Sequence, residues 1–170
     1  MQREVSYGEA MRRKYPEPIV IAISRDSQGK YNPITLGWFM PTSHEPPMVA
    51  ISVAFARHSY GAIRGSGCFV VSFPSEHMKE ETLFFGTKSG RELDKLAAMK
   101  TKIQQAKMID SVLLEDAVVN LECILKAELT TGDHAIFVGQ VVAAHVNADA
   151  ALRRLYTIDS HYGMSAVRPV

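Results

Sequence analysis

Residues 32–63 constrain the fold most, because they read as a strand, a loop, a second strand and then a turn into a helix. Residues 32–40 mix β-branched, aromatic and small side chains, and residues 41–47 contain two adjacent prolines that exclude a helix. Residues 48–56 alternate large and small side chains without an acidic residue, as a half-buried strand does. Two strands joined so closely favour antiparallel pairing, since parallel pairing needs a long crossover.

The rest of the chain continues this pattern of strands joined by short turns. Apolar or β-branched runs predict further strands at residues 19–24, 68–73, 117–129 and 135–147. Glycine and polar residues predict turns at residues 25–30 and 130–134. Helical segments are expected at residues 59–66, 75–85 and 91–98, with a helical turn at 149–155. About six strands, most of them following another strand, predict a mainly β fold: an antiparallel barrel with helical insertions.

Local details refine these predictions. Ser75 is expected to cap the second helix, and the glycines at 65 and 67 are expected to stop the first. Gly139, inside a long strand, predicts a bulge or a close backbone approach. Residues 100–107 are polar and are expected to form a mobile excursion.

We divide the chain into an N-terminal arm at 1–18, one domain at 19–155 and a C-terminal tail at 156–170. The arm is expected either to form a short amphipathic helix or to pack on a partner subunit. The tail is expected to be irregular.

Composition excludes several classes of protein. The chain has 170 residues, 46% of them hydrophobic and 22% charged, as is ordinary for a soluble globular domain. A formal net charge of +1 leaves no field that would attract nucleic acid or an acidic membrane. Cys68 and Cys123 lie in apolar runs and are expected in the core, without a metal-binding spacing. No signal core or membrane-spanning run is evident, so we expect a cytoplasmic protein.

A cluster of polar donors marks the end of the strand at 48–56. Arg57, His58, Ser59 and Tyr60 come together where this strand passes into a helix. Cation and hydroxyl donors at a helix N-terminus suit an anion. The alternative is an ordinary solvated strand end. Glycine motifs elsewhere precede a strand rather than a helix, so a Rossmann fingerprint and a P-loop are absent.

Six segments in order resemble one family. They are NPITLGW from residue 32, the Pro46-Pro47 pair, RHSYGAI from residue 57, FVVSFP from residue 69, FGTKSGRELDK from residue 85 and GDHAIFVGQV from residue 132. Together they resemble the flavin reductase-like, FMN-binding split-barrel family, particularly its flavoredoxin-type branch. The resemblance implies an antiparallel Greek-key split β-barrel, a homodimer, and one FMN in each subunit near the dimer interface.

The resemblance also assigns residues to the cofactor. Small residues let a flavin ring approach the main chain, and basic or hydroxyl side chains hold its phosphate. The cofactor-binding residues implied are Thr35, Leu36, Gly37, Trp38, Ser52, Val53, Arg57, His58, Ser59, Ser89, Gly90 and Lys95.

Several of these residues have a simpler interpretation. Trp38 can be a core or interface residue, and Thr35 can be a β-branched residue that only fills its strand. Lys95 can be a surface lysine on a helix, and Tyr60 can cap the barrel. His134 can be a solvated turn residue, but its GDH context resembles reductases that place a histidine where nicotinamide meets flavin. There it can donate a hydrogen bond or move a proton, so we take it as the candidate catalytic residue.

The predicted function is that of an FMN-binding flavoprotein, an NAD(P)H:flavin oxidoreductase that transfers hydride from NADH or NADPH to flavin. A transiently bound nicotinamide nucleotide and a homodimer partner are implied, and a monooxygenase or another redox protein can receive the electrons. Two alternatives stay open. One is a flavoredoxin-like carrier with tightly bound FMN and a protein redox partner, and the other is a non-catalytic FMN-binding protein.

Overall fold

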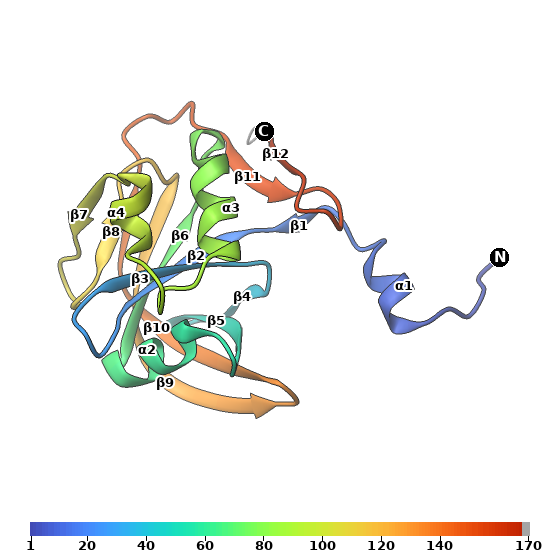
Figure 1. The fold of residues 1–170 in the computed structure, drawn as a ribbon, viewed down its shortest axis with the longest axis horizontal. Coiled ribbons are helices and arrows are strands. Elements are labelled where there is room, and N and C mark those ends of the chain that lie inside the picture. Colours follow the sequence, from blue (N-terminus) through green and yellow to red (C-terminus); the bar gives the residue numbers. More distant parts are fainter. Residues whose placement is uncertain (168–170) are drawn as a thin grey trace.

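The computed structural model describes residues 1–167, and most of its elements are strands (Figure 1). Seven antiparallel strands form the main sheet, in the spatial order β3-β2-β6-β9-β10-β5-β4. Their bounds are β2 Val20–Arg25, β3 Tyr31–Leu36, β4 Phe39–His44, β5 Pro47–Ala54, β6 Cys68–Phe73, β9 Val119–Thr131 and β10 His134–Val146. The predicted mainly β, antiparallel fold is confirmed.

The main sheet is curled into a split barrel. Its two edge strands, β3 and β4, are consecutive in the chain and are joined only by Gly37 and Trp38. A link this short spans about 10 Å at most, so the sheet must bend until its two edges come together at this end. The barrel is open along the seam between β3 and β4, and Gly37 and Trp38 lie where the seam begins.

Strand β2 is buried on both faces, as its continuous apolar sequence requires. Val20 and Ala22 pack inside the barrel with Phe69, whereas Ile21 and Ile23 pack on its outer face against a second core. That second core lies under a covering layer of short elements. They are η1 Glu76–Met78, α3 Lys79–Thr87, α4 Lys95–Met99, β7 Ile103–Gln105 and β8 Val112–Leu114.

Three predictions for this layer need correction. The segment at 75–85 begins with the 3-10 turn η1, and Ser75 makes no capping hydrogen bond because its hydroxyl is buried without a partner. Helix α4 begins at Lys95 instead of 91, since the side chain of Asp94 accepts the N–H of Ala97 and fixes the start there. Residues 100–107 are not an excursion, because β7 pairs with β8.

Strand β4 also departs from the sequence prediction, which placed a loop at 41–47. The backbone stays extended through Pro41 to His44 and pairs with β5 across a register shift. Proline is tolerated there because β4 is an edge strand, whose outward N–H groups need no ladder partner.

The elements that flank the candidate site agree with the sequence. Helix α2 spans His58–Ser66 and ends at Gly67, which has a left-handed φ of 67°. The two-residue turn between β9 and β10 uses Gly132 at φ 54°. The ladder of β10 shifts register at Gly139, where an added Cβ would lie 2.6 Å from Cζ of Phe69. Both the bulge and the close approach are therefore confirmed.

The two terminal segments meet in a small sheet of the order β1-β11-β12. Its strands are β1 Glu17–Pro18, β11 Arg154–Thr157 and β12 Met164–Val167. The predictions of a helical turn at 149–155 and of an irregular tail are wrong, because β11 and β12 form a hairpin that ends at Val167. Residues 168–170 lie outside the described part of the chain. Helix α1 (Tyr7–Met11) forms in the arm and projects from the body in Figure 1. Among residues 1–167, every helix is too short or too polar to cross a membrane.

Candidate functional site

A cavity of 270 Å³ lies where α2 begins, beside the loop between α3 and α4. We call it the basic cavity, because Arg57, His58, Lys88, Arg91 and Lys95 all line it. Six residues that the sequence assigned to flavin binding meet there from three segments of the chain. They are Arg57, His58, Ser59, Ser89, Gly90 and Lys95.

Arg57 and the first turn of α2 supply positive charge to the basic cavity. Arg57 is the N-cap residue of α2, and its exposed side chain forms no ion pair with any residue of the described range 1–167. The first N–H groups of a helix have no acceptor within the helix, and the helix dipole adds partial positive charge there. An anion in the cavity would therefore meet an uncompensated guanidinium and a helix N-terminus.

Lys95 is a buried cation in the same cavity. Its side chain is 3% exposed, and Nζ donates to the backbone oxygens of Phe85 at 3.1 Å and Lys88 at 3.4 Å. Burial and then the nearby charge of Arg57 lower the pKa of Lys95 to about 8. No carboxylate within residues 1–167 pairs with it, so a bound anion would relieve the cost of its charge.

Ser59 is held in the cavity by Asn32, a residue that the sequence prediction missed. Asn32 is 4% exposed, and its Nδ2 donates to Oγ of Ser59 at 2.7 Å. Its Oδ1 is buried without a partner in the structure. The sequence did contain a signal for Asn32: a polar side chain at an inward-facing position of a strand, directly before Pro33. A buried and half-satisfied amide is costly, which indicates a site built for a polar ligand.

Gly90 shapes the wall of the basic cavity. A Cβ at this position would lie 2.0 Å from Oδ1 of Asn32 and 3.0 Å from Cδ2 of His58. Only glycine fits between these two side chains, so the loop backbone approaches the cavity closely. Close packing at the cavity wall therefore accounts for glycine at position 90, next to Ser89, which an ordinary exposed loop would not require.

His58 turns toward Asp26 at the edge of the cavity. Its Nε2 lies 3.0 Å from Oδ2 of Asp26. Burial raises the pKa of Asp26, but hydrogen bonds from His58 and from the N–H groups of Lys30 and Gln28 outweigh burial and lower it. Because Nε2 of His58 contacts this carboxylate, His58 can offer a ligand in the cavity only its backbone N–H and the other side of its ring.

A second cavity of 170 Å³, the central cavity, adjoins the basic cavity through Arg57 and Gly86. Thr35 and Gly37 line it, and Oγ1 of Thr35 donates to the backbone oxygen of Thr82 at 2.6 Å. Oγ1 of Thr82 is buried there without a partner. Tyr15 of the arm, together with Thr157, Tyr162 and Met164 of the C-terminal segment, closes the cavity from the other side.

A third cavity of 350 Å³, the Trp38 cavity, continues from Gly37 across the neighbouring strands β4, β5 and β10. Trp38 is 47% exposed and lines it with Ser52, whose N–H donates to the backbone oxygen of Trp38 at 3.1 Å. Leu36 and Val53 direct their side chains into the barrel core, so they can offer a ligand only their backbone. The cofactor residues thus divide between a basic end and an apolar end.

His134 lies next to Trp38, at the first position of β10. The two ring centroids are 4.8 Å apart with an interplanar angle of 40°. Nδ1 of His134 lies 2.6 Å from Oδ1 of Asp133, and this contact lowers the pKa of Asp133. Because Nδ1 is engaged, Nε2 is the nitrogen left for a ligand near Trp38.

The fold and these cavities define a split-barrel protein in which a basic cavity is connected, through the central cavity, to the Trp38 cavity. A family model described as flavin reductase like domain matches residues 11–165. The chain belongs to the flavin reductase-like family, as the sequence motifs predicted.

Individual relatives are distant and differ in length. An uncharacterized protein of Archaeoglobus fulgidus is 28% identical over 113 residues, 66% of this chain and 64% of that protein. One from Aeropyrum pernix is 26% identical over 142 residues, 83% of this chain and 54% of its own length. A flavin reductase of Pseudomonas putida is 26% identical over 155 residues, 91% of this chain and 86% of that protein. The chain therefore spans less than two thirds of the two archaeal relatives.

Solved structures share the fold over nearly the whole chain. A flavoredoxin from Methanosarcina acetivorans has a TM-score of 0.86 and 22% identity, covering 100% of this chain and 93% of its own. An FMN-binding protein from Thermus thermophilus has a TM-score of 0.85 and 23% identity, covering 98% of this chain and 96% of its own. Both comparisons support the split-barrel architecture.

Proposed function

We propose that this chain binds FMN along the three cavities and acts as an NAD(P)H-dependent flavin reductase. The phosphate would be held in the basic cavity by Arg57, Lys95 and Ser59, with the first N–H groups of α2. The flavin ring would lie toward Gly37 and Trp38, where the backbone at the seam is accessible. The observation that carries this proposal is the gathering of the six predicted residues around one basic cavity.

The donor set fits a phosphate on physical grounds. Arg57 and Lys95 bring two cations without a paired carboxylate within the described residues, and Lys95 is desolvated. A phosphate dianion would provide the charge that both lack. Ser59 also fits, because its Oγ accepts from Nδ2 of Asn32 and its hydroxyl hydrogen can therefore donate to a phosphate oxygen.

Flavin, when bound, supplies a ring that accepts hydride from a nicotinamide. The part of this chain is then to orient the nicotinamide at the open end of the site. His134 can do this through Nε2, because Asp133 holds Nδ1 and Trp38 holds the ring. The same nitrogen can donate a hydrogen bond to a carboxamide or move a proton.

A flavoredoxin-like electron carrier is the second candidate. The closure of the central cavity by Tyr15 and Tyr162 favours it, since elements that cover a cofactor retain it between turnovers. In either case we propose a homodimer, because Trp38, Met40 and Leu129 leave apolar surface exposed on the barrel.

Anaerobic titration of the purified protein with NADH and with NADPH tests the proposal. The reductase interpretation predicts a visible flavin band, bound or acquired on adding FMN, that bleaches within seconds with one nucleotide. A band that bleaches only with dithionite would favour the carrier. Absence of flavin binding even with added FMN would contradict the proposed function.

A further inference from the structure

Lys95 is a buried amine that the proposed function uses only for its charge. Its side chain lines the basic cavity, and Nζ donates to the backbone oxygens of Phe85 at 3.1 Å and Lys88 at 3.4 Å. A neutral lysine amine has two hydrogens and one lone pair, so these two acceptors can hold both hydrogens of the neutral form. The lone pair then remains available, as a nucleophile requires.

The surroundings of Lys95 favour the neutral amine. The residue is 3% exposed, and burial followed by the positive charge of Arg57 lowers the pKa of Lys95 to about 8. At pH 8 about half of the molecules therefore have a neutral Lys95, against about 0.4% for a lysine of ordinary pKa near 10.4. Of the residues that line the cavity only Glu92 has a carboxylate, and it is exposed and forms no ion pair with Lys95.

The basic cavity also provides donors for a phosphate beside this amine. Arg57, Ser59 and the beginning of α2 line the same 270 Å³ as Lys95. This volume has room for about nine water molecules at about 30 Å³ each, which is enough for a small phosphorylated reagent. In an acyl phosphate the reactive carbonyl carbon is attached directly to a phosphate oxygen. Binding of that phosphate therefore brings the carbonyl carbon close to Lys95.

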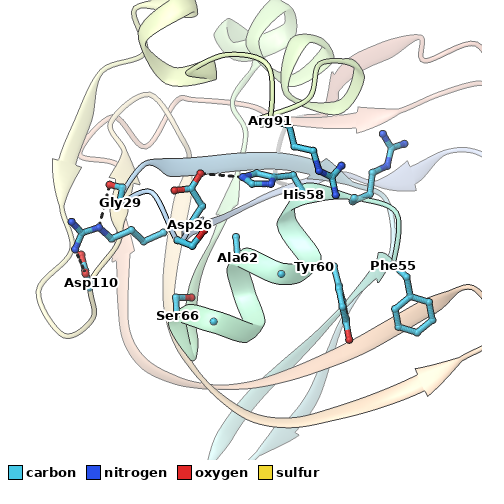
Figure 2. A pocket seen from close by; sticks show the side chains of 14 residues that line it. Asp26, Gly29, Phe55, His58, Tyr60, Ala62, Ser66, Arg91 and Asp110 are labelled. Atoms are coloured by element: carbon cyan, nitrogen blue, oxygen red, sulfur yellow. Dashed lines mark hydrogen bonds and ion pairs between the residues drawn. The ribbon is translucent and has the colours of Figure 1, made fainter.

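Other nucleophiles of the cavity are less suited to this reaction. The ring of His58 is turned toward Asp26, and its Nε2 lies 3.0 Å from Oδ2 of that carboxylate (Figure 2). The hydroxyl of Ser59 needs a general base before it can attack a carbonyl group. Lys88 lines the cavity but is exposed, so it lacks the burial of Lys95.

We propose that Lys95 is a site of acylation by acyl phosphates, and that this modification switches off FMN binding. The neutral Nζ attacks the carbonyl carbon and forms a C–N bond. The C–O bond to the phosphate breaks, the phosphate leaves with the electron pair of that bond, and the nitrogen loses a proton to solvent. The product is an amide, which has no charge to offer a phosphate and occupies part of the cavity. The proposal concerns regulation of the phosphate site, and its effect on FMN rests on the proposed function.

Acetyl phosphate is the probe that tests the site, with peptide mass spectrometry of the folded wild-type protein at pH 8 as the readout. We expect acetylation of Lys95 at least about tenfold faster than that of Lys88, in the same cavity, or of Lys102, whose side chain is 70% exposed. Saturating inorganic phosphate should slow the acetylation of Lys95 at least about tenfold and leave that of Lys102 unchanged. FMN should protect Lys95 in the same way.

Fluorescence titration then measures the effect of the modification on the cofactor. Protein acetylated at Lys95 should bind FMN at least about tenfold more weakly than unmodified protein. Its affinity for riboflavin, which has no phosphate, should change less than about twofold. The matched control is Lys95→Arg, in which acetyl phosphate can modify only the other lysines. Treatment of this variant should leave its FMN affinity unchanged.

The possible results separate this proposal from the proposed function. The proposal is overturned if Lys95 is acetylated no faster than Lys88 and Lys102, if inorganic phosphate gives no protection, or if the acetylated protein binds FMN as tightly as before. FMN binding without preferential acetylation would thus leave the proposed function intact. Preferential acetylation that inorganic phosphate prevents, in a protein that binds no FMN, would refute the proposed function and leave the acylation site intact.

Discussion

Binding of FMN to this protein should be accompanied by proton uptake near pH 8. The cause is Lys95, whose pKa burial and Arg57 lower from 10.5 to about 8. A phosphate dianion in the basic cavity would supply the missing opposite charge and return this pKa toward its ordinary value. At pH 8 the free protein is half protonated at Lys95, so the complex would gain about half a proton.

The sign and size of the effect follow from linkage. In the free protein the folded pKa lies below the unfolded one, so stability falls as pH decreases from 10.5 to about 8, by roughly 3 kcal/mol at most. FMN affinity should follow the opposite trend. It should be highest near pH 7, fall below about pH 6 as the phosphate takes up its second proton, and fall up to about tenfold for each pH unit above 8.

Calorimetric titration in two phosphate-free buffers of different ionisation enthalpy measures the uptake. Wild-type protein at pH 8 should take up about half a proton, and Lys95→Met should take up almost none. The reasoning is refuted if the wild type takes up no proton between pH 7 and 9, or if Lys95→Met takes up as much as the wild type. A thermal melt of each protein confirms that both are folded.

Three further substitutions test separate parts of the account. Gly90→Ala places a Cβ 2.0 Å from Oδ1 of Asn32, so FMN affinity measured by fluorescence should fall about tenfold. Gly139→Ala places a Cβ 2.6 Å from the buried ring of Phe69, so the free energy of unfolding measured in urea should fall by about 1–3 kcal/mol. His134→Gln should slow anaerobic flavin reduction by NADH or NADPH about a hundredfold in stopped flow, with FMN affinity unchanged.

A control substitution serves the stability test, and each of the three predictions has a result that would contradict it. Gly65→Ala should cost no stability, because a Cβ there meets no atom within 4 Å. If Gly139→Ala is as stable as Gly65→Ala, the close packing inferred at β10 is wrong. Undiminished FMN binding by Gly90→Ala would exclude the loop from the site. An unchanged reduction rate in His134→Gln would leave the residue only a structural role beside Trp38.

Features that depend on a continuous local pattern were predictable from the sequence. The apolar run of β2, the glycine that ends α2 and the bulge at Gly139 all follow from side chains in one segment. The polar cluster of Arg57 and Ser59 was visible in the sequence, but Lys95 was joined to it only through family resemblance. Lys95 comes from a different segment, and no local pattern states that the two segments meet.

The errors have a common physical origin in tertiary pairing. β4 continues through Pro41 because an edge strand tolerates the loss of an N–H, and no periodicity shows which strand is at an edge. β7 consists of three exposed residues, two of them glutamines, so only its pairing with β8 defines it as a strand. Likewise, β11 is extended because it pairs with β1 and β12, which overrides the helical preference of residues 149–155.

The importance of Asn32 and Arg91 was missed because both act across segments. Asn32 matters through Ser59, which lies 27 positions later in the chain. Arg91 matters because it lines the basic cavity and donates to the backbone oxygen of Ala56, just before α2. Buried polar contacts of this kind are properties of the folded chain rather than of a motif.

The most direct test of the central claim compares FMN with riboflavin, which lacks the phosphate, by equilibrium fluorescence titration. If Arg57, Ser59 and Lys95 hold the phosphate, wild-type protein should bind FMN at least about a hundredfold more tightly than riboflavin. The Arg57→Ala/Ser59→Ala variant, checked for folding, should lose most of that difference. Equal affinity of the wild type for FMN and riboflavin would contradict the account, because the basic cavity would then not bind the flavin phosphate.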